Sequence, residues 1–319
     1  MRQVYSKALG RNVSAIGFGC ASLGSRISPS GGRRAVEMAL EYGVRWFDVA
    51  PSYGDGQAEE LLGSCLQGQR DRVVICTKVG IARPSLSLSQ RLLRPLARTV
   101  VSGIPAARSV VRHAHKFPRR TAIHPDLIEA SLLQSLRSLR TDHVDVLALH
   151  EPTPEEAADK RIFDVLERLL DRGLIRAISV AGRPDSIIAS VSRRLRVDYA
   201  QFQDAPHNGV AARLRSELPS DRRPQFVTHG VFGTENSNEI SMLSSRASET
   251  LKFWLQEYDP NATEIVADLL LHFAFSNNPD GVVITSMFSA QHIEHNCSLA
   301  AKSPTPELAA KISALLKNR

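Results

Sequence analysis

The chain has 319 residues, of which 43% are hydrophobic and 23% charged, and its formal net charge is +7. It contains no apolar stretch of the roughly 18 residues that a membrane span needs, no secretory signal pattern, and no metal-ligand spacing among its four cysteines. We therefore expect a cytoplasmic protein with free thiols and no metal site.

Short apolar runs alternate with segments of helical periodicity along the chain. In 32–43, for example, Ala35, Met38, Ala39 and Tyr42 recur at i, i+3, i+4 and i+7, which predicts an amphipathic helix. The predicted strands are 14–19, 44–48, 72–78, 144–150, 175–180, 197–202, 224–230 and 281–286. The predicted helices that follow them are 32–43, 57–66, 125–139, 164–173, 185–195, 210–218, 262–276 and 290–301.

This alternation predicts an α/β fold with a parallel sheet, because strands that are separated by helices run in the same direction. Eight such units predict a (β/α)8 TIM barrel that forms a single domain over residues 1–319. The alternative is an open doubly wound sheet with a Gly-rich phosphate turn. The first turn, "GFGCASLG", is too far from the next helix to match that fingerprint, so we favour the barrel.

A long basic segment lies between the third predicted strand and the next helix. From Arg83 to Arg120 the sequence has nine Lys or Arg and no Asp or Glu. The positive charge is therefore local, and we expect no nucleic acid as a partner. We expect residues 83–120 to be an inserted, partly mobile excursion with a helix in "PAARSVVRHAHKF". It is either a solvated helix or a lid or docking surface for an acidic substrate, partner or anionic membrane surface.

Three neighbouring predicted strands end on polar residues: Asp48, Lys78 and His150, with Tyr53 in the loop after Asp48. In a parallel barrel, catalytic side chains come from the carboxyl ends of the strands and the loops beyond them. Each residue alone has a structural explanation, such as a turn cap or a solvated strand end. Since adjacent strands lie about 4.8 Å apart, we expect the four to converge, with Lys78 pairing with Asp48 and lowering the pKa of Tyr53.

These residues lie in motifs that resemble those of the aldo-keto reductase superfamily. "FDVAPSYGDG" resembles its tyrosine motif, "VVICTKVG" its lysine strand, and "SLLQSLRSLRTDHVDVLALHEP" the helix and strand that lead to its histidine. The resemblance covers nearly the whole chain and places the catalytic tetrad on Asp48, Tyr53, Lys78 and His150. It implies carbonyl reduction by a nicotinamide cofactor. Tyr53 would be the proton donor, Lys78 held by Asp48 would tune its pKa, and His150 would orient the carbonyl oxygen.

The residues expected to bind the cofactor depart from the family pattern. Ala181 and Gly182 stand where the family commonly has Ser and Asn, whereas Gln201 matches. The remaining residues that the resemblance places near the cofactor are Gly19, Cys20, His229, Ser286, Met287 and His292. No basic residue aligns with the usual 2′-phosphate contacts. The resemblance implies NADP(H) in preference to NAD(H), with weaker discrimination than is usual for the family.

Two functional hypotheses remain at this point. The first is a reductase that acts on an aldehyde, ketone or sugar carbonyl, or catalyses the reverse oxidation, with an unusual cofactor contact. The second is a catalytically weak or non-catalytic barrel with a binding or regulatory role. The intact tetrad favours the enzyme. The sequence identifies neither the substrate nor the oligomeric state.

Overall fold

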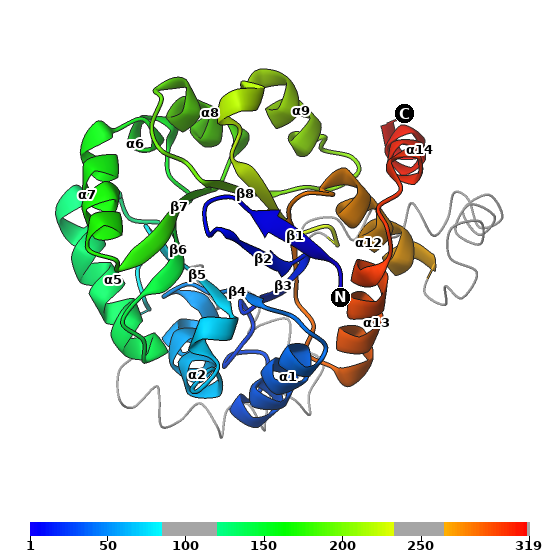
Figure 1. Cartoon of the computed structure of the whole chain (residues 1–319), viewed down its shortest axis with the longest axis horizontal. Helices are drawn as coiled ribbons and strands as arrows, with labels where there is room; N and C mark the ends of the chain where they lie inside the picture. Colours follow the sequence, from blue (N-terminus) through cyan, green and yellow to red (C-terminus); the bar gives the residue numbers. More distant parts are fainter. Residues whose placement is uncertain (85–119, 233–264, 318–319) are drawn as a thin grey trace, which may run out of the picture.

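Eight parallel strands form a closed barrel in the computed structural model, which describes residues 1–84, 120–232 and 265–317 (Figure 1). In barrel order, beginning and ending at neighbouring strands, they are β3 (Ile16–Gly19), β4 (Trp46–Asp48), β5 (Val74–Val79), β6 (Val144–His150), β7 (Ile175–Ala181), β8 (Tyr199–Gln203), β9 (Gln225–His229) and β10 (Val282–Thr285). All eight correspond to predicted strands, and the pairing of β10 with β3 closes the sheet. The predicted (β/α)8 barrel is confirmed.

Helices surround the barrel, and α13 contacts α1 to complete the ring (Figure 1). They are α1 (Pro29–Glu41), α2 (Ala58–Cys65), α5 (Pro125–Leu139), α6 (Pro154–Ala157), α7 (Lys160–Asp171), α8 (Pro184–Ser192), α9 (Val210–Glu217), α12 (Ile265–Asn277), α13 (Ala290–Ala301) and α14 (Pro306–Lys317). The helix α7 begins earlier than predicted because the side chain of Asp159 accepts a hydrogen bond from Arg161 N and caps it. The helices α6 and α14 were not predicted. None of the described helices is long and apolar enough to span a membrane.

The strand residues divide into two hydrophobic clusters, because successive side chains point to opposite faces of a sheet. One cluster lies inside the barrel and includes Trp46, Cys76, Ala148 and Tyr199. The other fills the layer between the strands and the helices, where Phe47 is found. Residues two apart along one strand therefore share an environment, and this alternation decides which strand-end side chains reach the mouth of the barrel.

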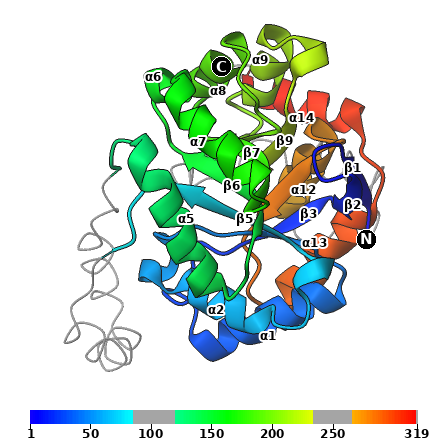
Figure 2. The same cartoon turned by 60° about the vertical axis from the view of Figure 1, so that its left-hand side comes forward.

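An antiparallel hairpin that the sequence did not predict covers one end of the barrel (Figure 2). It consists of β1 (Gln3–Ser6) and β2 (Arg11–Ser14), with Val4 paired to Val13. Both valines are buried and belong to the interior cluster. The Ser6 hydroxyl makes a hydrogen bond with the Tyr199 hydroxyl, so the hairpin is also joined to β8 by a buried polar contact.

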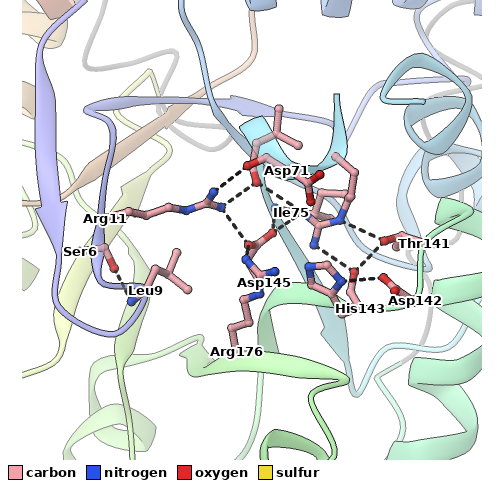
Figure 3. Close-up of polar contacts among 12 residues, drawn as sticks. Ser6, Leu9, Arg11, Asp71, Ile75, Thr141, Asp142, His143, Asp145 and Arg176 are labelled. Carbon is pink, nitrogen blue, oxygen red and sulfur yellow. Dashed lines mark hydrogen bonds and ion pairs between the residues drawn. The ribbon is translucent and has the colours of Figure 1, made fainter. Parts of the chain in front are cut away.

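A buried carboxylate fastens this hairpin to the strands (Figure 3). Asp145, at the N-terminal end of β6, is fully buried and accepts from Arg11 of the hairpin at 2.9 Å. Arg70 lies 2.8 Å from the other carboxylate oxygen, and Arg176 lies 3.4 Å from the first. The backbone N–H of Ile75 also donates to Asp145, at 2.9 Å. Four groups from separate segments therefore meet on one anion.

The two ends of the predicted basic excursion lie next to each other. Ile81 and Arg120 form an antiparallel bridge, and Thr121 N donates to Gly80 O at 3.3 Å. Residues 85–119, which include the helix expected in the second half of the excursion, lie outside the described residues. The structure shows that the segment leaves β5 and returns at adjacent points of the barrel.

Candidate active site

The predicted catalytic residues Asp48, Lys78 and His150 occupy inward-facing positions at the C-terminal ends of β4, β5 and β6. Each stands two residues beyond a side chain of the interior cluster, namely Trp46, Cys76 and Ala148. The alternation of strand side chains turns all three residues inward. In the register of the sheet, Asp48 pairs with Cys76, and Lys78 pairs with Ala148.

Lys78 and Asp48 form a buried ion pair with 2.5 Å between Nζ and Oδ1. The Lys78 side chain is 1% exposed and the Asp48 side chain 4%. Lys78 Nζ also donates to the carbonyl oxygen of Val49 at 3.2 Å, and Gln201 Nε2 donates to Asp48 Oδ2 at 2.9 Å. Burial alone lowers the pKa of Lys78, but the negative charge of Asp48 raises it above its ordinary value. Lys78 is therefore a permanent cation.

Tyr53 lies directly over this cation. The Lys78 Nζ atom is 4.7 Å from the centroid of the Tyr53 ring, and the ring meets His150 edge to face with 6.0 Å between centroids. Burial raises the pKa of Tyr53, whereas the charge of Lys78 and its hydrogen bond lower it. Lys78 lowers the pKa of Tyr53 as predicted, but the net shift is upward because desolvation of the phenolate outweighs the attraction of Lys78. Tyr53 therefore holds its proton at neutral pH.

His150 is a neutral imidazole at this site. Burial first, and then the charge of Lys78, lower its pKa to about 3. Burial also lowers the pKa of His229, at the end of β9, to about 4. Within the described part of the chain, His150 Nδ1 is buried and has no hydrogen-bond partner. A neutral ring next to Tyr53 can donate or accept a hydrogen bond without competing for the phenol's proton.

The residues predicted to contact a cofactor fall into two groups. Gly19, Gln201 and His229 continue the inward-facing positions of their strands, and Ser286 is exposed next to Gly19, where an added Cβ would lie 3.4 Å from its hydroxyl. The side chains of Cys20 and Met287 instead are completely buried in the layer between strands and helices. They can offer only backbone groups to a ligand.

Ser286 and His292 lie near the N-terminus of α13. His292 is exposed in the first turn, and its backbone N–H donates to the Ser289 hydroxyl at 3.1 Å, which caps the helix. Gly182 N donates to Gln201 O at 2.9 Å, which joins the ends of β7 and β8. Among the described residues, no group of His, Cys, Asp or Glu could hold a metal ion.

Sequence reasoning missed a second polar cluster behind the site. Glu59 on α2 is buried and accepts a hydrogen bond from Thr77, the residue before Lys78. Arg83 pairs with the same carboxylate. The signal for this cluster was an acidic residue on the face of a helix that also carries buried Ala58 and Leu62.

The sequence profile of the aldo/keto reductase family matches residues 15–208 of this chain. A D-threo-aldose 1-dehydrogenase from Pseudomonas sp is 30% identical over 198 residues, which cover 60% of this chain and 56% of that protein. A 6-dehydroglucose reductase from Agrobacterium fabrum is 32% identical over 65% of this chain and 66% of that protein. An L-galactose dehydrogenase from Arabidopsis thaliana is 26% identical over 93% of this chain and 88% of that protein.

The chain spans only about half the length of the aldose dehydrogenase and of two relatives from Bacillus subtilis, the aldo-keto reductase YhdN and the uncharacterized oxidoreductase YqkF. The fold is shared more widely. The holo form of an aldo-keto reductase from Bacillus halodurans superposes with a TM-score of 0.70 at 20% identity, covering 100% of this chain and 96% of that one. The profile match over residues 15–208 shows that the chain belongs to the aldo/keto reductase family.

Proposed function

We propose that this protein reduces an aldehyde, ketone or sugar carbonyl to an alcohol with a nicotinamide cofactor, or catalyses the reverse oxidation. The observation that carries the proposal is the Tyr53 ring over Lys78, with Lys78 paired to Asp48 and with His150 beside the ring. The names of the relatives, which include dehydrogenases of aldoses and of L-galactose, support a sugar or a sugar-derived carbonyl as the substrate.

A bound nicotinamide cofactor would supply a hydride to the carbonyl carbon. The residues of this chain handle the oxygen. Tyr53, protonated because of its raised pKa, gives its proton to the oxygen as negative charge develops there. The phenolate that remains is stabilised by the Lys78 cation. His150, which is neutral, donates a hydrogen bond that orients the carbonyl oxygen. Solvent then restores the proton of Tyr53.

The described residues fit a nicotinamide dinucleotide at some points and not at others. Gly19 has no side chain to block the mouth, Ser286 offers a hydroxyl beside it, and α13 presents a helix N-terminus that favours phosphate. The orphaned His150 Nδ1 also indicates a ligand or water at the mouth. Ala181 and Gly182 offer no side-chain hydrogen bond to a carboxamide, and the amide nitrogen of Gln201 is engaged with Asp48.

The hydrogen bond from Gln201 to Asp48 favours a second function, namely a barrel that binds cofactor weakly and acts as a binding or regulatory protein. Dissociation constants for NADPH and NADH, measured by titration of the pure protein, distinguish the two. Micromolar or tighter binding supports the enzyme, and binding of neither cofactor supports the alternative.

The Tyr53→Phe variant tests the proposed chemistry. It removes one hydroxyl and keeps the ring, so we expect the rate of carbonyl reduction to fall by about 10² to 10⁴, with cofactor affinity unchanged. The assay is cofactor oxidation against a panel of aldoses, aldehydes and ketones with both nicotinamide cofactors. A Tyr53→Phe variant that reduces carbonyls at the wild-type rate would exclude Tyr53 as the proton donor.

A further inference from the structure

The turn that carries Tyr53 has an unfavourable backbone. Tyr53 begins the 3-10 turn Tyr53–Gly56, in which Gly54, Asp55 and Gly56 have φ values of 58°, 57° and 86°. Asp55 is not a glycine, so its left-handed conformation is uncommon. Such a conformation persists only where the surrounding structure fixes it. Contacts with the surrounding structure must therefore hold this turn.

Two sets of contacts hold the turn, one on each side. On the first side, Gly54 N donates to Ala21 O at 3.3 Å, and Gly54 packs so closely on the Leu23 carbonyl that an added Cβ would lie 1.8 Å from its oxygen. On the second side, Arg83 donates to Gly56 O at 2.5 Å, and an added Cβ on Gly56 would lie 3.1 Å from Arg83 Cγ. Arg83 is thus both a hydrogen-bond donor and a packing partner of the turn.

The same arginine is fixed by a buried carboxylate. Arg83 pairs with Glu59, whose side chain is 0% exposed, and it donates to Ser138 Oγ at 3.1 Å. The other oxygen of Glu59 accepts from Thr77 Oγ1 at 2.7 Å. Thr77 directly precedes Lys78 on β5, and its side chain points to the outer face of the strand while that of Lys78 points inward.

These contacts connect one anion, Glu59, to the segments that carry Tyr53 and Lys78. Through Arg83, Glu59 holds the turn three residues beyond Tyr53, and through Thr77 it holds the strand at the residue before Lys78. We propose that Glu59, Arg83 and Thr77 form a clamp that positions Tyr53 over Lys78. The clamp residues do not touch the reacting atoms, so they are positioning residues. The kinetic part of this inference rests on the proposed role of Tyr53 as proton donor.

Two substitutions open the clamp without altering the site. Arg83→Met keeps the packing of the side-chain stem and removes the bonds to Gly56 and Glu59. Thr77→Val keeps the shape of the side chain and removes only the hydroxyl, and Thr77→Ser restores that hydroxyl. Arg176→Met is the matched control, since Arg176 is a partly exposed arginine that lies 3.4 Å from another buried carboxylate, Asp145. If Arg83→Met does not fold, Arg83→Lys and Thr77→Val carry the test.

We expect Arg83→Met to lower kcat for carbonyl reduction by about ten- to a hundredfold, because small misplacements of reacting groups have effects of that size. Cofactor affinity should stay within about twofold of wild type. Thr77→Val should show a smaller loss of kcat, and Thr77→Ser should recover it. Arg176→Met should leave kcat unchanged. A clamp that only stabilises the fold would instead lower the unfolding midpoint in Arg83→Met and leave kcat of the folded protein at the wild-type value.

A second measurement makes the test independent of catalysis. Amide hydrogen exchange of the peptide that contains residues 53–57 should be faster in Arg83→Met than in wild type and in Arg176→Met. Unchanged exchange together with unchanged kcat in Arg83→Met would overturn the clamp. If wild type and Tyr53→Phe reduce carbonyls equally well, the proton-donor role fails, and hydrogen exchange alone then decides whether the clamp holds the turn.

Discussion

At the scale of single residues, the site is built on the buried ion pair of Lys78 and Asp48. Neither charge would be stable alone in the barrel interior. Lys78 is almost completely buried, and it is tolerated there because Asp48 and the Val49 carbonyl accept its hydrogen bonds. Gln201 satisfies the second oxygen of Asp48. Each of these hydrogen bonds comes from a strand or from the first residue after it, which fixes the cation under the Tyr53 ring.

The two half-buried histidines, His150 and His229, predict how stability depends on pH. Their pKa values, about 3 for His150 and about 4 for His229, lie below the value near 6.5 of an unfolded histidine. Between these values the unfolded chain binds more protons than the folded protein. The free energy of unfolding that these two histidines contribute is therefore fully present above about pH 6.5. It is lost as pH falls toward 4 and then 3. Because both rings are partly exposed, we expect a loss on the order of 2 kcal/mol per histidine.

Urea unfolding at pH 7.5, 5.5 and 4.5 measures this loss. His229→Leu should flatten the decline of the free energy of unfolding with falling pH. His124→Gln, at a position whose side chain is 63% exposed, serves as the control and should follow wild type. A decline of the same slope in wild type and His229→Leu would show that other groups cause it.

Strand alternation explains how far the site could be predicted from sequence. Asp48, Lys78 and His150 could be found because a polar residue at the end of an apolar strand is conspicuous. The same alternation, carried one residue beyond the strand, would also have placed the side chains of Cys20 and Met287 outside the barrel, where the structure has them. The contact of Gln201 with Asp48 spans 153 positions of sequence and had no local signal.

At the scale of elements, sequence reasoning missed the N-terminal hairpin as well as α6 and α14. The strands of the hairpin, "QVYS" and "RNVS", have four residues each and only Val4 and Val13 in the interior cluster. Such short strands carry too little periodicity to be recognised. They form because distant residues complete them: Asp145 binds Arg11, and Tyr199 binds Ser6. The long amphipathic helix α5, by contrast, has the predicted bounds because its apolar face repeats over several turns.

The Asp145 cluster predicts a graded set of substitutions. Asp145→Asn leaves three guanidinium groups without their anion, and we expect a loss of about 3 to 5 kcal/mol of unfolding free energy. Arg11→Met should cost about 1 to 3 kcal/mol, since it removes a hydrogen bond to a charged group. Arg176→Met should cost under about 1 kcal/mol, because that side chain is 45% exposed and its contact is longer.

Urea denaturation of the three variants checks this order, and cofactor titration should give wild-type affinity for each. Equal losses for Arg11→Met and Arg176→Met would contradict the account, because the two arginines differ in burial and in distance from Asp145.

The basic segment predicts the outcome of a deletion. Since Ile81 and Arg120 are paired, removing residues 85–118 leaves a short connection between adjacent backbone positions. We expect the barrel to fold with an unfolding midpoint within a few degrees of wild type, because the length of a loop has only a weak effect on stability. If the segment is a lid or a docking surface, the KM for the carbonyl substrate or the binding of an acidic partner will change. Unaltered kinetics and binding would support the other interpretation of this segment, a solvated helix.

At the scale of the whole molecule, the fold was predictable because eight repeats of one strand–helix unit reinforce one another. An error at any single boundary, such as the early start of α7, does not change the topology. The cofactor preference was less predictable, because it depends on a few exposed groups near the carboxyl ends of the strands, where the sequence departs from the family pattern. Ser286 and His292 are both exposed there.

We predict that the protein prefers NADPH to NADH by a small factor that increases at low pH. A 2′-phosphate is usually selected by an Arg or Lys, and the N-terminus of α13 offers only backbone N–H groups, the Ser286 hydroxyl and His292. A histidine carries more charge at pH 6 than at pH 8. Dissociation constants for both cofactors at these two pH values test the prediction, and His292→Gln should remove the pH dependence. A large preference that is the same at both pH values would require a basic residue from elsewhere in the chain.

The hairpin beneath the barrel also constrains the order in which the protein acquires its structure during synthesis. Its residues are made before every strand of the barrel, yet Arg11 needs Asp145, Ser6 needs Tyr199, and Arg2 donates to the carbonyl oxygen of Pro279 at 2.6 Å. At translation rates of about 5–20 residues per second, these partners emerge over roughly 7 to 60 seconds. The hairpin lacks these partners for that time, so we expect its docking to be among the last steps of folding.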